Sequence, residues 1–152
     1  LIQFISSYIV STAFSILYSV PKKLLPYTGL VGATGYIISY LLLNYLDWTN
    51  FIATTIASFI IGLMSQLFAQ KLKTPVIIFT MPGIIPLVPG GAAYNMMRAF
   101  IEGNADLGIS FGTETLLAGG ALALGLALNS AIFQLFTNRN ILGRNSRFPT
   151  EE

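Results

Sequence analysis

The sequence predicts an all-α, polytopic membrane protein with five transmembrane helices, the fourth of which is broken. Two observations predict this fold class. Hydrophobic residues make up 54% of the 152 residues and charged residues only 9%, whereas a soluble domain carries about 25% charged residues. Apolar runs also recur along the chain, and their length is close to the ~20 residues that a helix needs to cross a bilayer core. Runs of this length exclude a β-barrel, whose strands alternate over about ten residues.

Short polar segments separate the five predicted spans. The first span covers residues 2–20, and we expect a retained helix because neither a basic start nor a small-residue cleavage site marks a signal peptide. The second and third spans end at polar or basic turns, and the fifth ends before an arginine-containing tail. These four later spans cover residues 25–46, 51–70, 75–102 and 113–136.

The basic residues sort to one side of this arrangement. Seven of the eight Lys and Arg residues lie in the first connection, the third connection and the tail: Lys22, Lys23, Lys71, Lys73, Arg139, Arg144 and Arg147. Because Lys and Arg accumulate on the cytoplasmic side, we expect the N-terminus outside and the C-terminus inside. The predicted domains are a five-helix domain in the cell membrane, residues 1–138, and a cytoplasmic polar tail, residues 139–152.

Composition excludes several classes of function. The chain has no His and no Cys, which removes histidine bases, thiol nucleophiles, disulfides and the usual zinc sites. A net charge of +2 is too small for an electrostatic nucleic-acid binder. We therefore predict no enzyme activity, no catalytic residue, no metal or cofactor and no nucleic-acid partner. Membrane lipid is the predicted surrounding partner.

The fourth span contains the strongest local signal. Three prolines, each of which lacks an N–H and clashes with the carbonyl four residues earlier, lie among three glycines that add backbone freedom. The side chains between them are too apolar for an external loop. We expect irregular backbone at membrane depth, buried in protein or lining a watery cavity, and then a second half-helix from about residue 90 to 100. The six residues are Pro82, Gly83, Pro86, Pro89, Gly90 and Gly91.

Discontinuous helices of this kind hold anionic substrate groups at half-helix N-termini in many transporters. The six residues of the break are therefore candidate substrate-binding residues, together with Tyr94 one turn later. Gln66 of the third span joins them, because its amide is too polar to face lipid cheaply. Arg98 and Glu102, four residues apart, form a candidate ion pair or gate. The alternative for the break is a proline kink that serves packing alone.

Small or polar residues recur at every fourth position on the first, third and fifth spans, and three small residues form a smaller notch on the second. Helices associate in lipid where small residues let backbones touch, so these stripes predict helix packing, with a watery lining as the alternative for the third. The stripes are Ser7, Ser11, Ser15 and Ser19; Gly32, Gly35 and Ser39; Thr54, Ser58, Gly62, Gln66 and Gln70; and Gly119, Ala123, Ala127 and Ala131.

The segment from Pro82 to Tyr94, PGIIPLVPGGAAY, resembles the threonine/serine exporter (ThrE-like) family, and more narrowly its small YjjB-like subunit type. That type carries a Pro-x-Val-Pro-Gly-x-x-x-Tyr-like segment late in a five-helix unit. Supporting matches are Val20–Pro21, the run from Gly29 to Tyr36, and Gln66 nine residues before Pro75. The resemblance covers residues 3 to 138.

This resemblance implies a subunit of a secondary transporter that exports small amino acids such as threonine and serine. It also implies a second five-helix subunit, because a unit like this one follows another five-helix unit in fused members. Some two-subunit members are linked to dicarboxylate export, so a small dicarboxylate such as succinate is the alternative substrate. Homo-oligomerisation stays open. The alternative from another class of function is a membrane protein that transports nothing and instead binds a partner protein. In that case the three-proline segment would be its docking surface.

Overall fold

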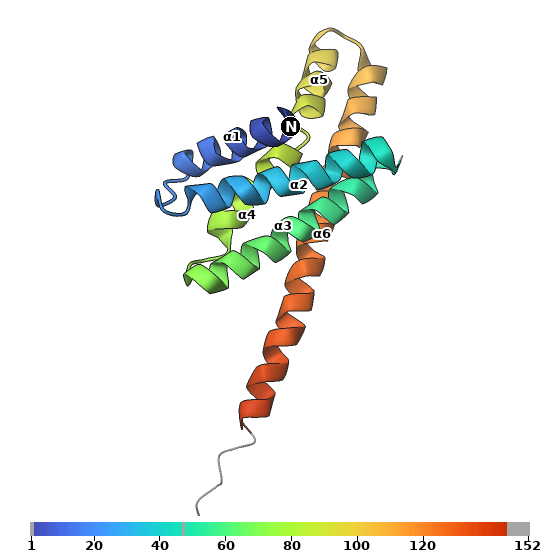
Figure 1. Ribbon diagram of the computed structural model, residues 1–152. Helices are drawn as coiled ribbons and strands as arrows, with labels where there is room; N and C mark the ends of the chain where they lie inside the picture. The colour runs from blue at the N-terminus through green and yellow to red at the C-terminus, as the bar shows by residue number, and fades with distance from the viewer. Residues whose placement is uncertain (1, 47, 146–152) are drawn as a thin grey trace, which may run out of the picture.

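The computed structural model describes residues 2–46 and 48–145, with side chains as far as residue 135. Every regular element in these ranges is helical (Figure 1). The elements in chain order are α1 (Ile2–Leu17), α2 (Leu25–Tyr45), α3 (Asn50–Leu72), α4 (Ile77–Ile84), the 3₁₀ turn η1 (Ile85–Leu87), α5 (Gly90–Ile101) and α6 (Ala105–Asn145).

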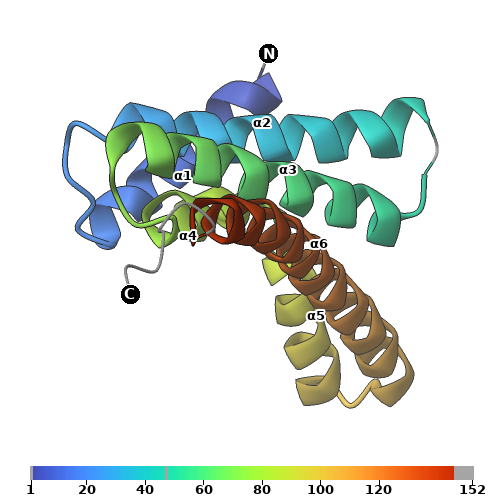
Figure 2. The ribbon, with the colours of Figure 1, turned by 90° about the horizontal axis from the view of Figure 1, so that it is seen from below.

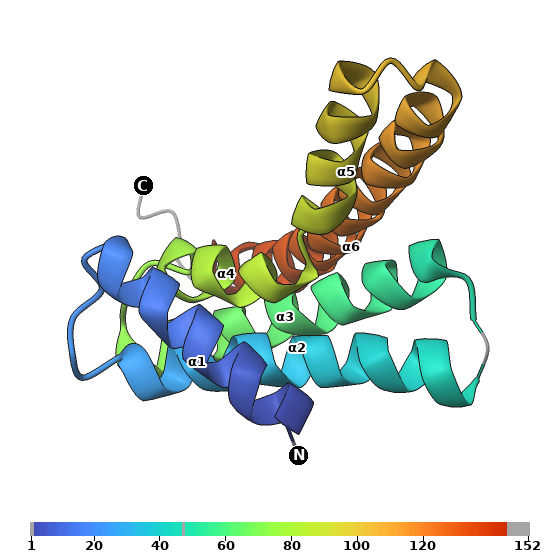
Figure 3. The ribbon, with the colours of Figure 1, turned by 90° about the horizontal axis from the view of Figure 1, so that it is seen from above.

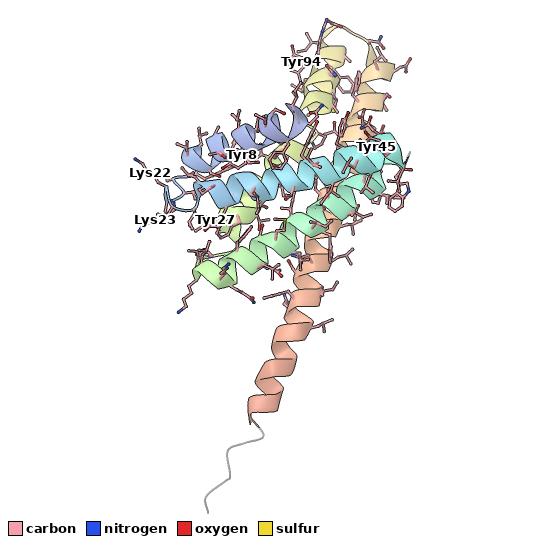
Figure 4. The ribbon with its side chains drawn as sticks, viewed as in Figure 1. Tyr8, Lys22, Lys23, Tyr27, Tyr45 and Tyr94 are labelled. Carbon is pink, nitrogen blue, oxygen red and sulfur yellow. The ribbon has the colours of Figure 1, made fainter. Side chains whose placement is uncertain are left out.

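Helices α1 to α4 form a bundle in which α2 contacts α1, α3 and α4. The α1–α2 and α3–α4 connections lie at one end of the bundle and the α2–α3 connection at the other (Figure 3). Lys22 and Lys23 mark the first end and Tyr45 the second (Figure 4). The basic connections predicted to share a side therefore do share an end of the bundle.

Small residues hold α1 against α2. Ser7, Ser11 and Ser15 are buried, and the Ser15 and Thr28 hydroxyl oxygens form a hydrogen bond of 2.6 Å between the two helices. A methyl group on Gly32 would clash with Ser11. The packing prediction for this stripe is confirmed as far as Ser15.

The fourth span is broken inside the predicted stretch, but the irregular backbone starts later than predicted because Pro82 and Gly83 remain in a regular helix. The helix passes through Pro82, tightens into η1 and ends at Val88, whose ψ of 130° is extended. A second helix, α5, starts at Gly90 after a bend of 53°. The carbonyl of Ile85, which loses a helical donor to Pro89, accepts instead the N–H of Val88 at 3.2 Å, so it is not free.

The last helix is longer than predicted. It begins at Ala105 rather than at residue 113, because Gly103 adopts a φ of 79° and the side chain of Asn104 accepts the N–H of Leu107 at 3.3 Å. The link between α5 and α6 is therefore a short turn, and the two helices project together from the bundle (Figures 2 and 3). Residues 139–145 of the predicted tail are helical.

The predicted small-residue stripe of α6 is not the face that packs within the described part of this chain. The predicted stripe is exposed at Gly119, Ala123, Ala127 and Ala131. The buried positions are Ala118, Ala121, Leu122, Gly125 and Asn129. Gly125 explains this choice, because it lies directly on α3: a methyl group there would clash with Ser58 and with the carbonyl of Thr55.

By length and composition, two helices of the described ranges can cross a membrane: α3, and α6 over Ala105–Leu135. The bent pair Ile77–Leu87 and Gly90–Ile101 is a third if it forms one span. Helix α1 is apolar but shorter.

Candidate functional site

The first half of the break is packed into the bundle. Pro82 is fully buried. Gly83 lies so close to two helices that a methyl group on it would be 2.8 Å from Val31 Cγ1 on α2 and 3.1 Å from Ile61 Cγ2 on α3. Its carbonyl oxygen faces Gly32, where a methyl group would lie 3.4 Å away. These two predicted site residues therefore fix α4 against α2 and α3.

The second half of the break is open. A methyl group on Gly90 or Gly91 would meet no atom within 4 Å, and Tyr94 is 68% exposed on the projecting part of α5 (Figure 4). The N–H of Gly90 donates to the carbonyl of Val88 at 2.8 Å. The start of α5 therefore presents accessible backbone, with Pro86 and Pro89 half-buried beside it.

Gln66 lies elsewhere, in a cavity of about 290 Å³ between α3, α4 and α6. It is only 6% exposed, and Asn129 on α6 is 3% exposed. The lining residues are Gly62, Gln66, Val76, Ile77, Thr80, Met81, Leu126, Asn129 and Ser130. The cavity thus gathers polar side chains from three helices, and no residue from 82 to 94 lines it.

The sequence builds this cavity from helical spacing and one glycine. Gly62 and Gln66 are four residues apart and share a face of α3. Since Gly62 has no side chain, Asn129 reaches the α3 backbone: a methyl group on Gly62 would lie 2.9 Å from Asn129 Cγ. On the α4 wall the Thr80 hydroxyl donates to the carbonyl of Val76 at 3.1 Å, which leaves its oxygen as an acceptor.

The amide oxygen of Gln66 is buried without a hydrogen-bond partner in the protein. Leaving a buried acceptor unsatisfied costs about 1–3 kcal/mol. A glutamine used only for packing is therefore a poor choice at this position, since methionine fills similar space without the penalty. Gln66 therefore brings an unpaired buried acceptor to the wall of the cavity.

Sequence reasoning found Gln66 but missed Asn129, Thr80 and Ser130. A signal for the first of these exists: Asn129 is one of two amides, with Gln134, inside the apolar run 113–136. An amide there is as unsuited to lipid as Gln66.

The predicted ion pair forms on the outside of α5. Arg98 Nε donates to Glu102 Oε1 at 2.8 Å, and the two side chains are 63% and 57% exposed. The pair lies beside the α5–α6 turn and lines neither the cavity nor the start of α5.

A family model described as Threonine/Serine exporter, ThrE, matches residues 3–132 of this chain. The chain belongs to the threonine/serine exporter family. A protein of Haemophilus influenzae, described as an uncharacterized protein, is 29% identical over 131 residues, which cover 81% of this chain and 44% of that protein. The chain therefore spans less than half the length of this curated relative. No solved structure matches the chain.

Membership in the threonine/serine exporter family identifies a membrane protein of the transporter type rather than of an enzyme class. The matched range runs from α1 into α6 and contains both the break and every residue that lines the Gln66 cavity. Both features therefore lie within the region that matches the family.

Proposed function

We propose that this protein is a subunit of a secondary transporter that exports small amino acids such as threonine and serine across the cell membrane. The observation that carries the proposal is the broken fourth span inside the region that matches the exporter family. Irregular backbone at membrane depth is tolerated only where it is buried or lines a watery space, and it marks substrate sites in transporters.

The substrate-facing groups are those at the open half of the break and in the cavity. The backbone amides at the start of α5 offer a positive dipole end to a carboxylate, with Tyr94 one turn away. Gln66 supplies an acceptor from α3. Pro82, Gly83, Pro86 and Pro89 set the bend that separates α4 from α5, and Arg98 with Glu102 is a candidate gate at the end of α5.

The proposed topology has five spans, with the N-terminus outside, the C-terminus inside and the bent α4–α5 pair as one span. The shared end of the two lysine-bearing connections supports it. So does length: at 1.5 Å per residue, the 21 residues of α2 reach about 32 Å, near the ~30 Å of a bilayer core.

Cysteine labelling tests this topology cleanly because the chain has no native Cys. We expect a membrane-impermeant maleimide added to intact cells to label Asn50→Cys, at the start of α3, and to spare Lys22→Cys until the cells are opened. Both residues are exposed, so they form a matched pair. Labelling of Asn50→Cys only in opened cells would contradict the proposed orientation.

A second five-helix subunit is the proposed partner. The small residues Gly119, Ala123 and Ala127 are exposed along one face of α6, and a methyl group on Gly119 would meet no atom within 4 Å. Small residues on a lipid-exposed face let another helix approach closely. A second copy of this chain would occupy the same face in a homo-oligomer.

Reconstitution tests the function and its alternatives together. In proteoliposomes that hold this chain and the second subunit, we expect efflux of threonine and serine that depends on both proteins. Efflux of succinate alone would show that the substrate is a dicarboxylate rather than an amino acid. The accessible amides at the start of α5 favour this alternative, because they attract carboxylates. Absence of efflux for all three solutes would leave the protein as a non-transporting membrane partner.

A further inference from the structure

The Gln66 cavity has the composition of a binding site for a small solute without net charge. We propose that it binds a small molecule through a hydroxyl group that donates to the Gln66 amide oxygen, with the Asn129 amide as the second polar contact. This inference rests on the proposed function in taking the ligand to be a transported solute. It assigns recognition to α3 and α6 rather than to the break in the fourth span.

The unpaired oxygen of Gln66 is the first argument. Four buried side-chain oxygens of the described residues have no hydrogen-bond partner, on Ser11, Ser65, Gln66 and Thr74. That of Gln66 belongs to a residue that lines the cavity between α3, α4 and α6. A ligand donor placed there would satisfy a group that the protein leaves unsatisfied, which is how a buried acceptor selects a donor.

Size and charge are the second argument. About 290 Å³ lies at the lower end of the ~300–1,000 Å³ typical of ligand pockets, which suits a small solute. None of the nine lining residues is charged. A dianion would lose its hydration there without gaining a cation, whereas a zwitterion brings its own compensating charges.

Access is the third argument. Ile77 and Met81 line the cavity and are themselves exposed, so the cavity opens past α4. A neighbouring apolar cavity of about 460 Å³ on the other side of these residues has no buried polar side chain in its lining: Tyr18, Val20, Ile77, Ile78, Met81 and Pro82. The polar cavity is therefore distinguished by chemistry rather than by volume.

Binding to the purified full chain in nanodiscs tests the proposal by calorimetry. The probes are L-threonine, L-valine, which has the same shape without the hydroxyl, and succinate. We expect saturable threonine binding at least about tenfold tighter than valine binding, because a site built for a hydroxyl rejects the analogue that lacks it, and no succinate binding. Absence of threonine binding, equal affinity for valine, or preference for succinate would overturn the proposal.

Two matched variants locate the site. Gln66→Met should weaken threonine binding at least about tenfold and leave valine binding unchanged. Gln70→Met, one turn later and exposed, should leave both unchanged. The thermal midpoint of Gln66→Met should equal or exceed that of the natural chain, because an unpaired buried amide is removed. Equal threonine binding by both variants would overturn the proposal.

Asn129→Leu provides an independent variant on another helix should Gln66→Met fail to fold. It should also weaken threonine binding about tenfold, and unchanged binding would overturn the assignment. Efflux measurements separate this inference from the proposed function. Threonine efflux without binding in this cavity would contradict the proposed site and support the proposed transporter function. Binding without efflux would support the site and contradict the transporter function.

Discussion

Gly125→Ala should lower the free energy of unfolding by about 1–3 kcal/mol, a large effect for one added methyl group. That methyl group would clash with Ser58 Oγ and the Thr55 carbonyl oxygen and would lie 2.9 Å from the Phe59 nitrogen. Two of these three atoms belong to the α3 backbone, so no change of rotamer relieves the contact. Helices α3 and α6 must move apart, and denaturation in detergent, followed by circular dichroism, measures the loss.

Gly120→Ala is the matched control on the same helix. A methyl group at Gly120 would meet no atom within 4 Å, so the free energy of unfolding should not fall and should rise by up to about 1 kcal/mol, because alanine favours a helix interior over glycine. An equal loss in both variants would show that close contact at Gly125 is not the cause.

The double substitution Pro86→Ala and Pro89→Ala should remove most of the export activity while expression and membrane insertion persist. Each proline disfavours a continuous helix by about 3 kcal/mol, so replacing both favours it by up to about 6 kcal/mol. A change of about 5.5 kcal/mol inverts a population from 1:99 to 99:1. The new N–H groups can donate to the carbonyls of Pro82 and Ile85, and α4 would continue into α5.

Spin labels on Ile77→Cys and Met97→Cys report the straightening, because both positions are exposed and lie on opposite sides of the 53° bend. Their separation should increase in the double variant. Pro26→Ala is the control, since a proline at the start of α2 is compatible with a helix. Unchanged separation would show that packing of Pro82 and Gly83 holds the bend, and full export with increased separation would make the bend irrelevant to transport.

Run length and proline spacing sufficed to predict α1 to α5, because both are local properties of the chain. The start of α6 was missed because Gly108 and Gly112 are typical of a loop. In the structure they serve packing: a methyl group on Gly108 would lie 2.7 Å from Phe100 Cε1, and one on Gly112 would lie 3.2 Å from Met96 Sδ. A glycine that admits a neighbouring side chain and a glycine that ends a helix look alike in one sequence.

The candidate site shows the same limit. Gln66 stands out because an amide in an apolar run is expensive in lipid, and Asn129 meets that criterion as well. Their meeting in one cavity depends on where α6 crosses α3, and the helix faces do not determine this. Small residues follow two faces of α6, one through Gly119 and Ala123 and one through Gly125 and Asn129, and only the second packs.

The unbroken length of α6 connects the break in the fourth span with the Gln66 cavity. Phe100 and Met96 of α5 pack on Gly108 and Gly112 near the start of α6, and Asn129 on the same helix lines the cavity. At 1.5 Å per residue, about 36 Å of continuous helix separates Ala105 from Asn129. One helix therefore contacts both features, and a change in the angle at the break would also move α6 against α3 at the cavity.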